Sequence, residues 1–285
     1  MSRSQSVITG WKIKMPELPE VETIVRVLET SLKGSQIQSM DFRYPSLLEE
    51  GSEFPLEFLI GKSFTNFSRR GKYLIFEFDH AYAWIVHLRM EGKFHLYELP
   101  QRPTVHTHLV LECDDHSVHY LDTRKFSRMA VVSDVDAYFI AKKLGPEPFG
   151  IDPEYLYKKI KKSSRAVKNI LLDQSVVVGI GNIYADEILF ETQIHPLTKG
   201  NAITKQDVAN LVVVIESVLN SAIEQGGTTI RSYTSSLNVN GRFQVRLNAY
   251  GQAGKPCTRC GHILSRIVLG GRSTVFCSQC QKVKR

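Results

Sequence analysis

Two groups of residues in this sequence have the types and spacing to do chemistry, and the first is the segment MPELPE at residues 15–20. If Met15 is removed, Pro16 becomes an N-terminal secondary amine. An α-amino group has a pKa of roughly 8, so part of it is neutral and nucleophilic near pH 7. Such an amine can form a Schiff base, whose iminium ion acidifies the neighbouring carbon. Taken alone, the segment fits equally well a capped helix whose acidic residues favour the helix dipole.

The second group is a set of four cysteines near the C-terminus. They form two Cys-x2-Cys pairs separated by sixteen residues: Cys257, Cys260, Cys277 and Cys280. Four thiolates at this spacing can fold around one tetrahedral Zn²⁺ and leave no position for water, so we predict one structural zinc ion. Zinc deaminases share half of the pattern but also need a His-x-Glu motif, which none of the nine histidines provides.

The charge balance allows an acidic partner, because 36 lysines and arginines outnumber 29 aspartates and glutamates, for a net charge of +7. Nucleic acid is the commonest such partner, although charge alone leaves membranes and chance open. No apolar run approaches the roughly 20 residues that span a bilayer. Residues 1–14 also lack the apolar core of a signal peptide. We therefore expect a cytoplasmic protein without a membrane partner.

The elements that must position these residues can be predicted from periodicity. Pro19 suits the first turn of a helix, and Gly34 suits its end. Between them, apolar residues recur at helical spacing: Val21, Ile24, Val25 and Leu28. From about residue 37 to 133, successive short β-rich runs predict a sandwich or a barrel.

The rest of the chain is predicted to be mostly helical. The segment Gly145-Pro146-Glu147-Pro148 is interpreted as a hinge, because proline resists helical continuation. Helical patterns follow at 155–161, 165–172, 183–192 and 205–225, then a polar loop at 226–241 and the cysteine module from 254. We expect an α+β protein with four parts: an extension or mis-assigned start (1–14), a catalytic β-sandwich domain with a leading helix (15–145), a helical domain with a loop (146–241) and a zinc finger (242–285).

Further motifs occur along the chain in a fixed order. They are RRGKY at 69–73, HLRMEG at 87–92, DTRKF at 122–126, LGPEP at 144–148, VGIGNIY at 178–184 and QGGTT at 225–229. Together with MPELPEVET at 15–23 and the cysteine module, they resemble the formamidopyrimidine-DNA glycosylase family over residues 15 to 283. The resemblance implies a β-sandwich, a helix-two-turn-helix domain and a zinc finger, with double-stranded DNA held in the cleft between the lobes.

The resemblance also implies a mechanism. The Pro16 amine would attack the sugar C1′ and displace an oxidised purine, such as 8-oxoguanine or a formamidopyrimidine. The iminium ion would then permit β,δ-elimination at the abasic site, which makes the enzyme both glycosylase and lyase. Glu17 would be the general acid and base. Glu20 would support the site, although capping of the helix explains it equally well.

Other residues match family positions that contact DNA. Lys72 and Arg272 would bind phosphates and assist elimination, and Asn182, His106, Arg124 and Lys168 would contact the DNA. Met90, Arg124 and Phe126 match the side chains that fill the gap left by the flipped nucleotide. Glu91 and the loop residue Tyr233 match positions near the lesion. From sequence alone, Lys72 would be an exposed strand-end lysine, and Met90 and Phe126 would be core residues.

Four features depart from the family pattern. Thr107 stands where aspartate is usual, Ser127 where glycine is usual, and Asn169 where proline is usual. None of these removes a chemical group that the mechanism needs. The fourth is the segment before Met15. While it is attached, Pro16 is linked through an amide bond, and an amide nitrogen has no basic lone pair with which to attack.

Two alternative functions remain open at this stage. The protein could be a non-catalytic relative that binds damaged DNA with a blocked proline. It could also be an oxidised-pyrimidine glycosylase of the endonuclease VIII branch, although DTRKF and the long 226–241 loop resemble the purine branch more. In each case we expect a monomer in a bacterial cytoplasm, associated with the nucleoid.

Overall fold

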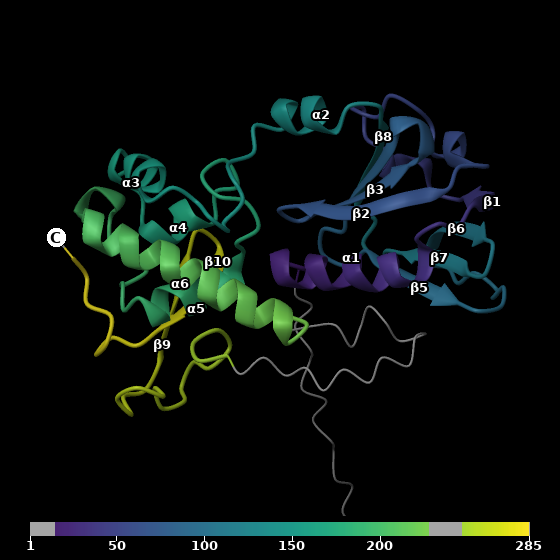
Figure 1. Ribbon diagram of the computed structural model, residues 1–285. Helices are drawn as coiled ribbons and strands as arrows, with labels where there is room; N and C mark the ends of the chain where they lie inside the picture. The colour runs from purple at the N-terminus through teal and green to yellow at the C-terminus, as the bar shows by residue number, and fades with distance from the viewer. Residues whose placement is uncertain (1–14, 228–246, 285) are drawn as a thin grey trace, which may run out of the picture.

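The computed structural model describes residues 15–227 and 247–284, which form two lobes lying side by side (Figure 1). The segment 1–14, most of the polar loop and the predicted lesion contact Tyr233 lie outside the described residues.

The first lobe is a β-sandwich that follows a single helix, α1 (Leu18–Leu32). Two antiparallel sheets have the strand orders β1-β6-β7-β5 and β2-β3-β4-β8. The strands are β1 (Ile37–Phe42), β2 (Phe64–Arg70), β3 (Tyr73–Phe78), β4 (Ala83–His87), β5 (Lys93–Tyr97), β6 (Thr107–Cys113), β7 (Ser117–Leu121) and β8 (Arg128–Val132). The prediction of a leading helix and a sandwich is therefore confirmed, and two separate sheets decide against a barrel.

Alternation of side chains along β3 shows how the sandwich is held together. Leu74 and Phe76 contact the core between the sheets, whereas Ile75 contacts a second cluster with Tyr138 and Phe139 of α2 (Val135–Ala141). Successive side chains of a strand point to opposite faces, so this sheet is buried on both sides. It gives rigid support to the loops at the strand ends.

The second lobe is a helical domain. It contains α3 (Pro153–Lys161), α4 (Val167–Leu171), α5 (Asn182–Glu191) and α6 (Lys205–Glu224). Buried residues of α6 recur every three or four positions: Val208, Leu211, Val212, Ile215, Leu219 and Ala222. By length and composition alone α6 could cross a membrane, but it packs through this stripe and contacts α1, α3 and α5. It is a core helix of this domain.

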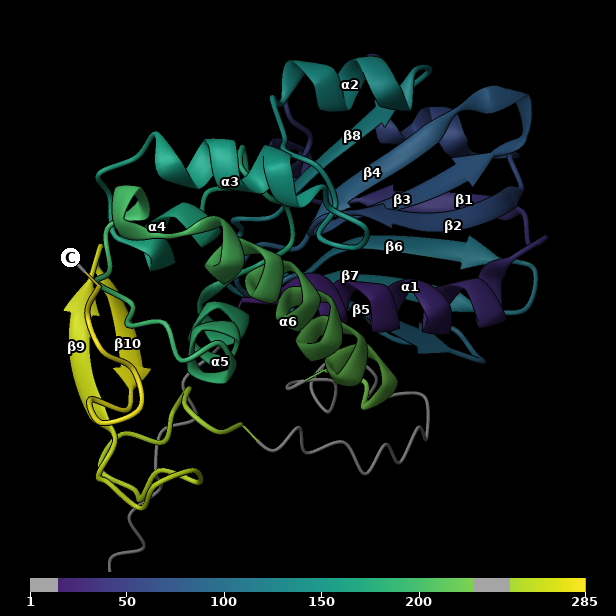
Figure 2. The same cartoon turned by 60° about the vertical axis from the view of Figure 1, so that its left-hand side comes forward.

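The C-terminal part is a hairpin that lies beside α5 (Figure 2). Strands β9 (Ser265–Leu269) and β10 (Arg272–Phe276) pair antiparallel. A small apolar cluster joins the hairpin to α5. It contains Phe190 of α5, Leu264 and Val275 together with two of the cysteines. The finger is thus anchored on the helical domain.

Candidate active site

The carboxylate of Glu17 is held at the N-terminus of α5, although α5 begins about 165 residues later in the chain. Its oxygens accept hydrogen bonds from the backbone N–H groups of Gly181 (2.9 Å), Ile183 (2.8 Å) and Tyr184 (3.2 Å). A helix N-terminus offers unpaired N–H groups and the positive end of the helix dipole. The residue that follows Pro16 is therefore fixed to the second lobe.

Glu17 can nevertheless hold a proton near neutral pH. Burial raises its pKa to about 7, because desolvation outweighs the nearby Lys72 ammonium and the backbone hydrogen bonds. The carboxylate of Glu20 adds to the rise. Glu20 is itself buried and accepts hydrogen bonds from the Glu17 N–H (3.0 Å) and the Tyr184 hydroxyl (2.8 Å). A group that is about half protonated at neutral pH can both donate and accept a proton.

Gly179 and Gly181 let the two lobes approach this closely. A Cβ at Gly181 would lie 2.2 Å from Cδ of Glu17, and one at Gly179 would lie 2.4 Å from Cδ1 of Leu18. The carbonyl oxygen of Gly179, whose φ is +86°, also accepts a hydrogen bond from the Leu18 N–H at 3.1 Å. The two glycines thus leave room for α1 to pack against this loop. Neither a phosphate-binding loop nor a simple tight turn, the two usual interpretations of such a glycine pattern, includes this packing role.

Lys72 faces Glu17 from the turn between β2 and β3. Its Nζ donates to the carbonyl oxygen of Ile180 at 3.0 Å, and the residue is only 7% exposed. Burial lowers its pKa, while the charges of Glu17 and Glu20 act in the opposite direction. It is therefore not the exposed strand-end lysine that its position alone would suggest.

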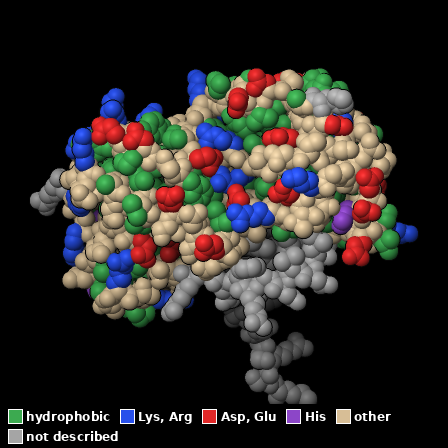
Figure 3. All heavy atoms as spheres, viewed as in Figure 1, with side chains coloured by type: hydrophobic (Ala, Val, Ile, Leu, Met, Phe, Trp, Pro, Cys, Tyr) green, Lys and Arg blue, Asp and Glu red, His purple; other side chains and the backbone are tan. Residues whose placement is uncertain are grey.

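A cleft of about 600 Å³ brings several of the predicted residues together. Its walls include Glu17, Lys72, Met90, Asn182 and Arg272. Pro16 is buried between Met15 and Glu17, which both line the cleft. Removal of Met15 would therefore place the proline amine at the cleft. On the face drawn in Figure 3, lysine and arginine side chains gather among acidic ones where the lobes meet.

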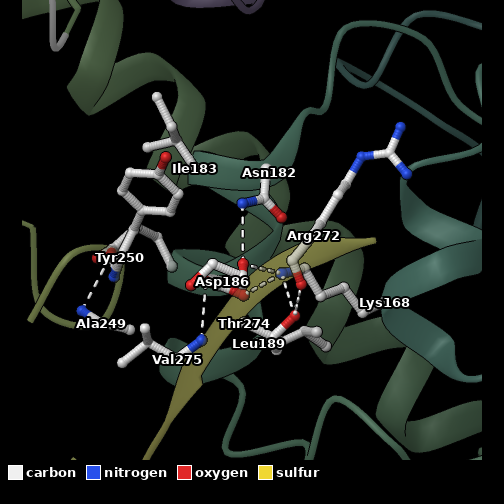
Figure 4. A network of polar contacts seen from close by, with 12 residues as sticks. Lys168, Asn182, Ile183, Asp186, Leu189, Ala249, Tyr250, Arg272, Thr274 and Val275 are labelled. Atoms are coloured by element: carbon white, nitrogen blue, oxygen red, sulfur yellow. Dashed lines mark hydrogen bonds and ion pairs between the residues drawn. The ribbon is translucent and has the colours of Figure 1, made fainter. Parts of the chain in front are cut away.

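Asn182 and Arg272 come from different domains and meet at one wall of the cleft (Figure 4). The Asn182 Nδ2 donates to the carbonyl oxygen of Ser273, next to Arg272, at 2.9 Å. The side chain of Arg272 is exposed and extends away from the polar network behind it (Figure 4). An exposed guanidinium at a cleft wall is suited to bind a phosphate.

The side chain of Lys168, which was predicted to contact DNA, is fully buried in this structure. Its Nζ forms an ion pair with Oδ1 of Asp186 at 2.7 Å and donates to Oγ1 of Thr274 at 2.7 Å. These contacts hold the ammonium between α4, α5 and β10. The sequence did not reveal this because both partners lie far from Lys168 along the chain.

The predicted gap-filling residues lie on two loops of the sandwich lobe. Met90 is half-buried, and Glu91 beside it is half-buried as well. The Arg124 guanidinium lies 4.6 Å from the ring centre of Phe126, and Phe126 is 49% exposed. An aromatic ring and a guanidinium that stack in solvent are free to enter a base stack. Neither Met90 nor Phe126 is a buried core residue.

Two departures from the family pattern have a structural explanation. The hydroxyl of Ser127 lies 2.7 Å from Oδ2 of Asp122 and 3.0 Å from the carbonyl oxygen of Leu88, so it ties the two loops together. The buried Thr107 accepts a hydrogen bond from the Thr104 N–H at 3.0 Å. This bond shapes the turn that presents the exposed His106.

Sequence reasoning missed three residues of this region. Tyr250 lines the cleft, and no sequence signal marked it. Asp186 pairs with Lys168, and Glu187 accepts hydrogen bonds from three backbone N–H groups, those of Asn248, Ala249 and Tyr250. Two adjacent acids in the otherwise apolar run IYADEILF could have indicated buried partners, because buried carboxylates need them.

The four cysteines converge as the spacing predicted. Their sulfur atoms all lie within 4.8 Å of one another, with 3.5 Å between Cys260 and Cys277 and 4.0 Å between Cys257 and Cys280. A tetrahedral Zn²⁺ with bonds of about 2.3 Å separates its sulfur ligands by roughly 3.8 Å. The prediction of one structural zinc ion is confirmed, and the four thiolates close its coordination sphere.

Comparison with known proteins defines the class. Residues 15–129 match the N-terminal domain of formamidopyrimidine-DNA glycosylase, 144–234 match its helix-two-turn-helix domain, and 254–283 match the zinc finger found in these glycosylases and in isoleucyl-tRNA synthetases. The three domains occur in the order that the motifs implied. They are those of a DNA glycosylase.

Relatives agree over nearly the whole chain. Formamidopyrimidine-DNA glycosylase of Exiguobacterium sp. is 42% identical over 275 residues, which cover 94% of this chain and 100% of the relative. The Bacillus subtilis enzyme is 41% identical over 278 residues, covering 95% and 100%. A Lactococcus lactis relative bound to Fapy-dG-containing DNA superposes with a TM-score of 0.87 at 40% identity, covering 94% and 100%. The chain belongs to the formamidopyrimidine-DNA glycosylase family.

Proposed function

We propose that this glycosylase removes oxidised purines from double-stranded DNA with the amine of Pro16 as its nucleophile, freed by loss of Met15. Its family membership carries the glycosylase activity, and lyase activity is typical of that family. The observation that supports the nucleophile is geometric. Pro16 is buried between two residues that line the cleft, next to a carboxyl group whose pKa is about 7. The family match begins at residue 15.

The excision step needs a nucleophile and a proton. The Pro16 nitrogen would form a bond to C1′ as the bond from C1′ to the base breaks. The base would leave with the electron pair and take up the proton that the amine nitrogen loses. Protonated Glu17 would give its proton to the sugar ring oxygen, so that the ring opens and an iminium ion forms. This is the chemistry of amine nucleophiles, assisted by a general acid at a suitable pKa.

Strand cleavage would follow from the iminium ion. A base, for which deprotonated Glu17 is suited, removes a C2′ proton and the 3′ phosphate leaves in β-elimination. A second elimination expels the 5′ phosphate, and water then hydrolyses the Schiff base and regenerates the amine. Lys72 and Arg272 would stabilise the negative charge on the leaving phosphates.

We propose that the remaining predicted residues, apart from the buried Glu20 and Lys168, contact the DNA directly. Asn182, His106 and Arg124 would contact the backbone, and Met90 with Phe126 would occupy the gap. Glu91 and Tyr233 would lie near the lesion. The domains would be 15–145, 146–241 and 242–285, each with its own apolar cluster. We further propose a monomer in a bacterial cytoplasm, associated with the nucleoid.

Borohydride trapping on a duplex that contains 8-oxoguanine opposite cytosine tests the proposal. Protein that starts at Pro16 is expected to form a covalent DNA adduct and to release the base. Protein that retains residues 1–15 should form none, because its proline is an amide. Adduct formation by the extended protein would overturn the role of the amine. If the shortened protein binds the duplex but forms no adduct, the result would favour a non-catalytic DNA-binding relative. Activity on oxidised pyrimidines alone would favour the endonuclease VIII branch.

A further inference from the structure

A buried polar network joins the helical domain to the zinc finger directly behind Arg272 (Figure 4). Its centre is the pair of Lys168 in α4 and Asp186 in α5, whose side chains are 0% and 1% exposed. A buried ion pair loses hydration energy that its attraction offsets only with good geometry and further hydrogen bonds. Apolar residues could pack α4 against α5 equally well. The ion pair must therefore have a role beyond joining the two helices, and that role is indicated by its other hydrogen bonds.

What the pair holds is the first half of β10. The Nζ of Lys168 donates to Oγ1 of Thr274 (2.7 Å) and to the carbonyl oxygen of Ser273 (3.2 Å). Oδ2 of Asp186 accepts the N–H of Val275 at 3.0 Å. Three consecutive residues of one strand are thus tied to α4 and α5, and the residue immediately before them is Arg272.

The hairpin is also held at this end of the strand by its own β9–β10 pairing and by Asn182 of α5, whose Nδ2 donates to the Ser273 carbonyl oxygen at 2.9 Å. Its turn consists of Gly270 and Gly271, whose φ angles are +57° and +75°. A Cβ at Gly270 would lie 3.1 Å from Oδ1 of Asn169, so the turn touches α4 beside Lys168. A two-stranded hairpin is only marginally stable by itself. The direction in which Arg272 leaves the strand therefore depends on the contacts with the helices.

We propose that Lys168 and Asp186 are positioning residues for Arg272, which hold the start of β10 where the guanidinium meets a DNA phosphate. The inference rests on the proposed phosphate contact of Arg272. Helix α5 then has two tasks, because its N-terminus holds Glu17 and its middle carries Asp186. One rigid helix thereby sets the spacing between the nucleophile and the phosphate contact.

A double-mutant cycle tests the proposal. We combine Lys168→Met with Arg272 and with Arg272→Ala. The same two combinations are made with Lys168→Met plus Asp186→Asn, which leaves no buried charge unpaired. The readouts are affinity for duplex DNA with a tetrahydrofuran abasic-site analogue across a salt series, and the ratio of β- to β,δ-elimination products on a natural abasic site. Residues that act through one another are non-additive in such a cycle.

We expect Arg272→Ala to weaken binding about tenfold, as loss of one charged hydrogen bond does, and to lower the salt slope by about 0.9. Lys168→Met should reproduce most of both effects while Arg272 is present. On top of Arg272→Ala it should add less than about twofold. It should also shift the elimination products in the same direction as Arg272→Ala.

A matched control removes a lysine from another ion pair. Lys142 pairs with Glu49 at 2.8 Å in the sandwich lobe, and Lys142→Met should leave the salt slope and the product ratio unchanged. Zinc content and the urea midpoint of each variant show whether the finger is intact. If Lys168→Met does not fold, Thr274→Val removes the hydroxyl acceptor without changing charge, and it should show the same coupling to Arg272 at about threefold.

Each contrary result has a distinct meaning. Equal effects of Lys168→Met with and without Arg272 would show an independent DNA contact and overturn the inference. No effect in the presence of Arg272, with a folded protein, would overturn it too. If Arg272→Ala alone leaves affinity, slope and products unchanged, the proposed function of Arg272 itself is wrong, and this single variant reveals it.

Discussion

Two buried carboxylates of this protein, Glu17 and Glu187, have nearly the same surroundings. Each accepts hydrogen bonds from three backbone N–H groups, and burial raises the pKa of each. Each has an acidic neighbour, Glu20 for Glu17 and Glu191 for Glu187, but only Glu17 also has a nearby cation, Lys72, that lowers its pKa. They also differ in what they hold, since Glu17 follows Pro16 at the cleft and Glu187 anchors residues 248–250.

This comparison shows that a raised pKa does not by itself mark a catalytic group. Structural carboxylates also acquire shifted pKa values when they are buried. The functional difference comes from a neighbouring amine, a neighbouring cation and access to the cleft. Experiments that treat the two residues alike can therefore separate catalysis from structure.

The largest expected effect separates the two carboxylates directly. Glu17→Gln removes the transferable proton and should slow single-turnover release of 8-oxoguanine by roughly 10²–10⁴-fold. Glu187→Gln should change that rate less than about threefold, while it lowers the free energy of unfolding by about 1–2 kcal/mol through a disturbed hydrogen-bond cluster. Equal rate losses in the two variants would contradict the distinction.

The pH dependence of excision should sharpen the comparison further. If Glu17 acts as the general acid, the rate falls above its pKa of about 7, because the proton is lost. Lys72 lowers that pKa, so Lys72→Met should move the falling limb to higher pH as well as slow the reaction. The measurement is a single-turnover rate profile from pH 5 to 9. If the falling limb stays at the same pH in Lys72→Met, the limb does not report the pKa of Glu17.

Stability should respond to pH in the same direction at both carboxylates. The pKa of Glu17 is about 7 in the folded protein and 4.5 ordinarily, so the folded state binds the proton more tightly. Its contribution is fully present below pH 4.5 and is lost as pH rises to 7, a change on the order of 3 kcal/mol.

Urea unfolding at pH 5 and pH 7.5 measures this change. Glu17→Gln should flatten the decline, and Glu187→Gln should flatten it too, because burial raises that pKa as well. A decline that is as steep in Glu17→Gln as in the parent protein would show that Glu17 is not buried in its acid form. Stability thus reports burial at both sites, and activity reports only one of them.

The smallest expected effect concerns the cations near Glu17. Lys72→Ala or Arg272→Ala should each lower the salt slope of abasic-site binding by about 0.9, because each removes one phosphate contact. The slope comes from affinities measured between 50 and 300 mM salt. If a slope does not change, that residue is not a phosphate contact.

Much of this protein could be predicted from local pattern. The cysteine spacing gave the zinc site because two turns bring four thiolates together without help from distant residues. Strand alternation and helical spacing gave the sandwich and the helices in nearly their observed ranges. Glu17 and Lys72, which both line the cleft, stand in motifs that occur in the family's order.

Long-range packing accounts for what could not be predicted. Nothing in the sequence indicated that Lys168 would be buried against Asp186, because the two residues meet only through the packing of α4 on α5. Glycine is required at 179 and 181 because Leu18 and Glu17 of the other lobe occupy the space that a Cβ would need. Such contacts depend on how the lobes meet, and no local pattern contains that information.

The most direct test of the central claim locates the covalent bond. Protein that starts at Pro16 is trapped with borohydride on abasic-site DNA, digested with protease and nuclease, and mapped by mass spectrometry. We expect the sugar remnant on the Pro16 nitrogen and nowhere else. A remnant on Lys72 or another lysine, or full excision by protein that still carries Met15, would contradict it.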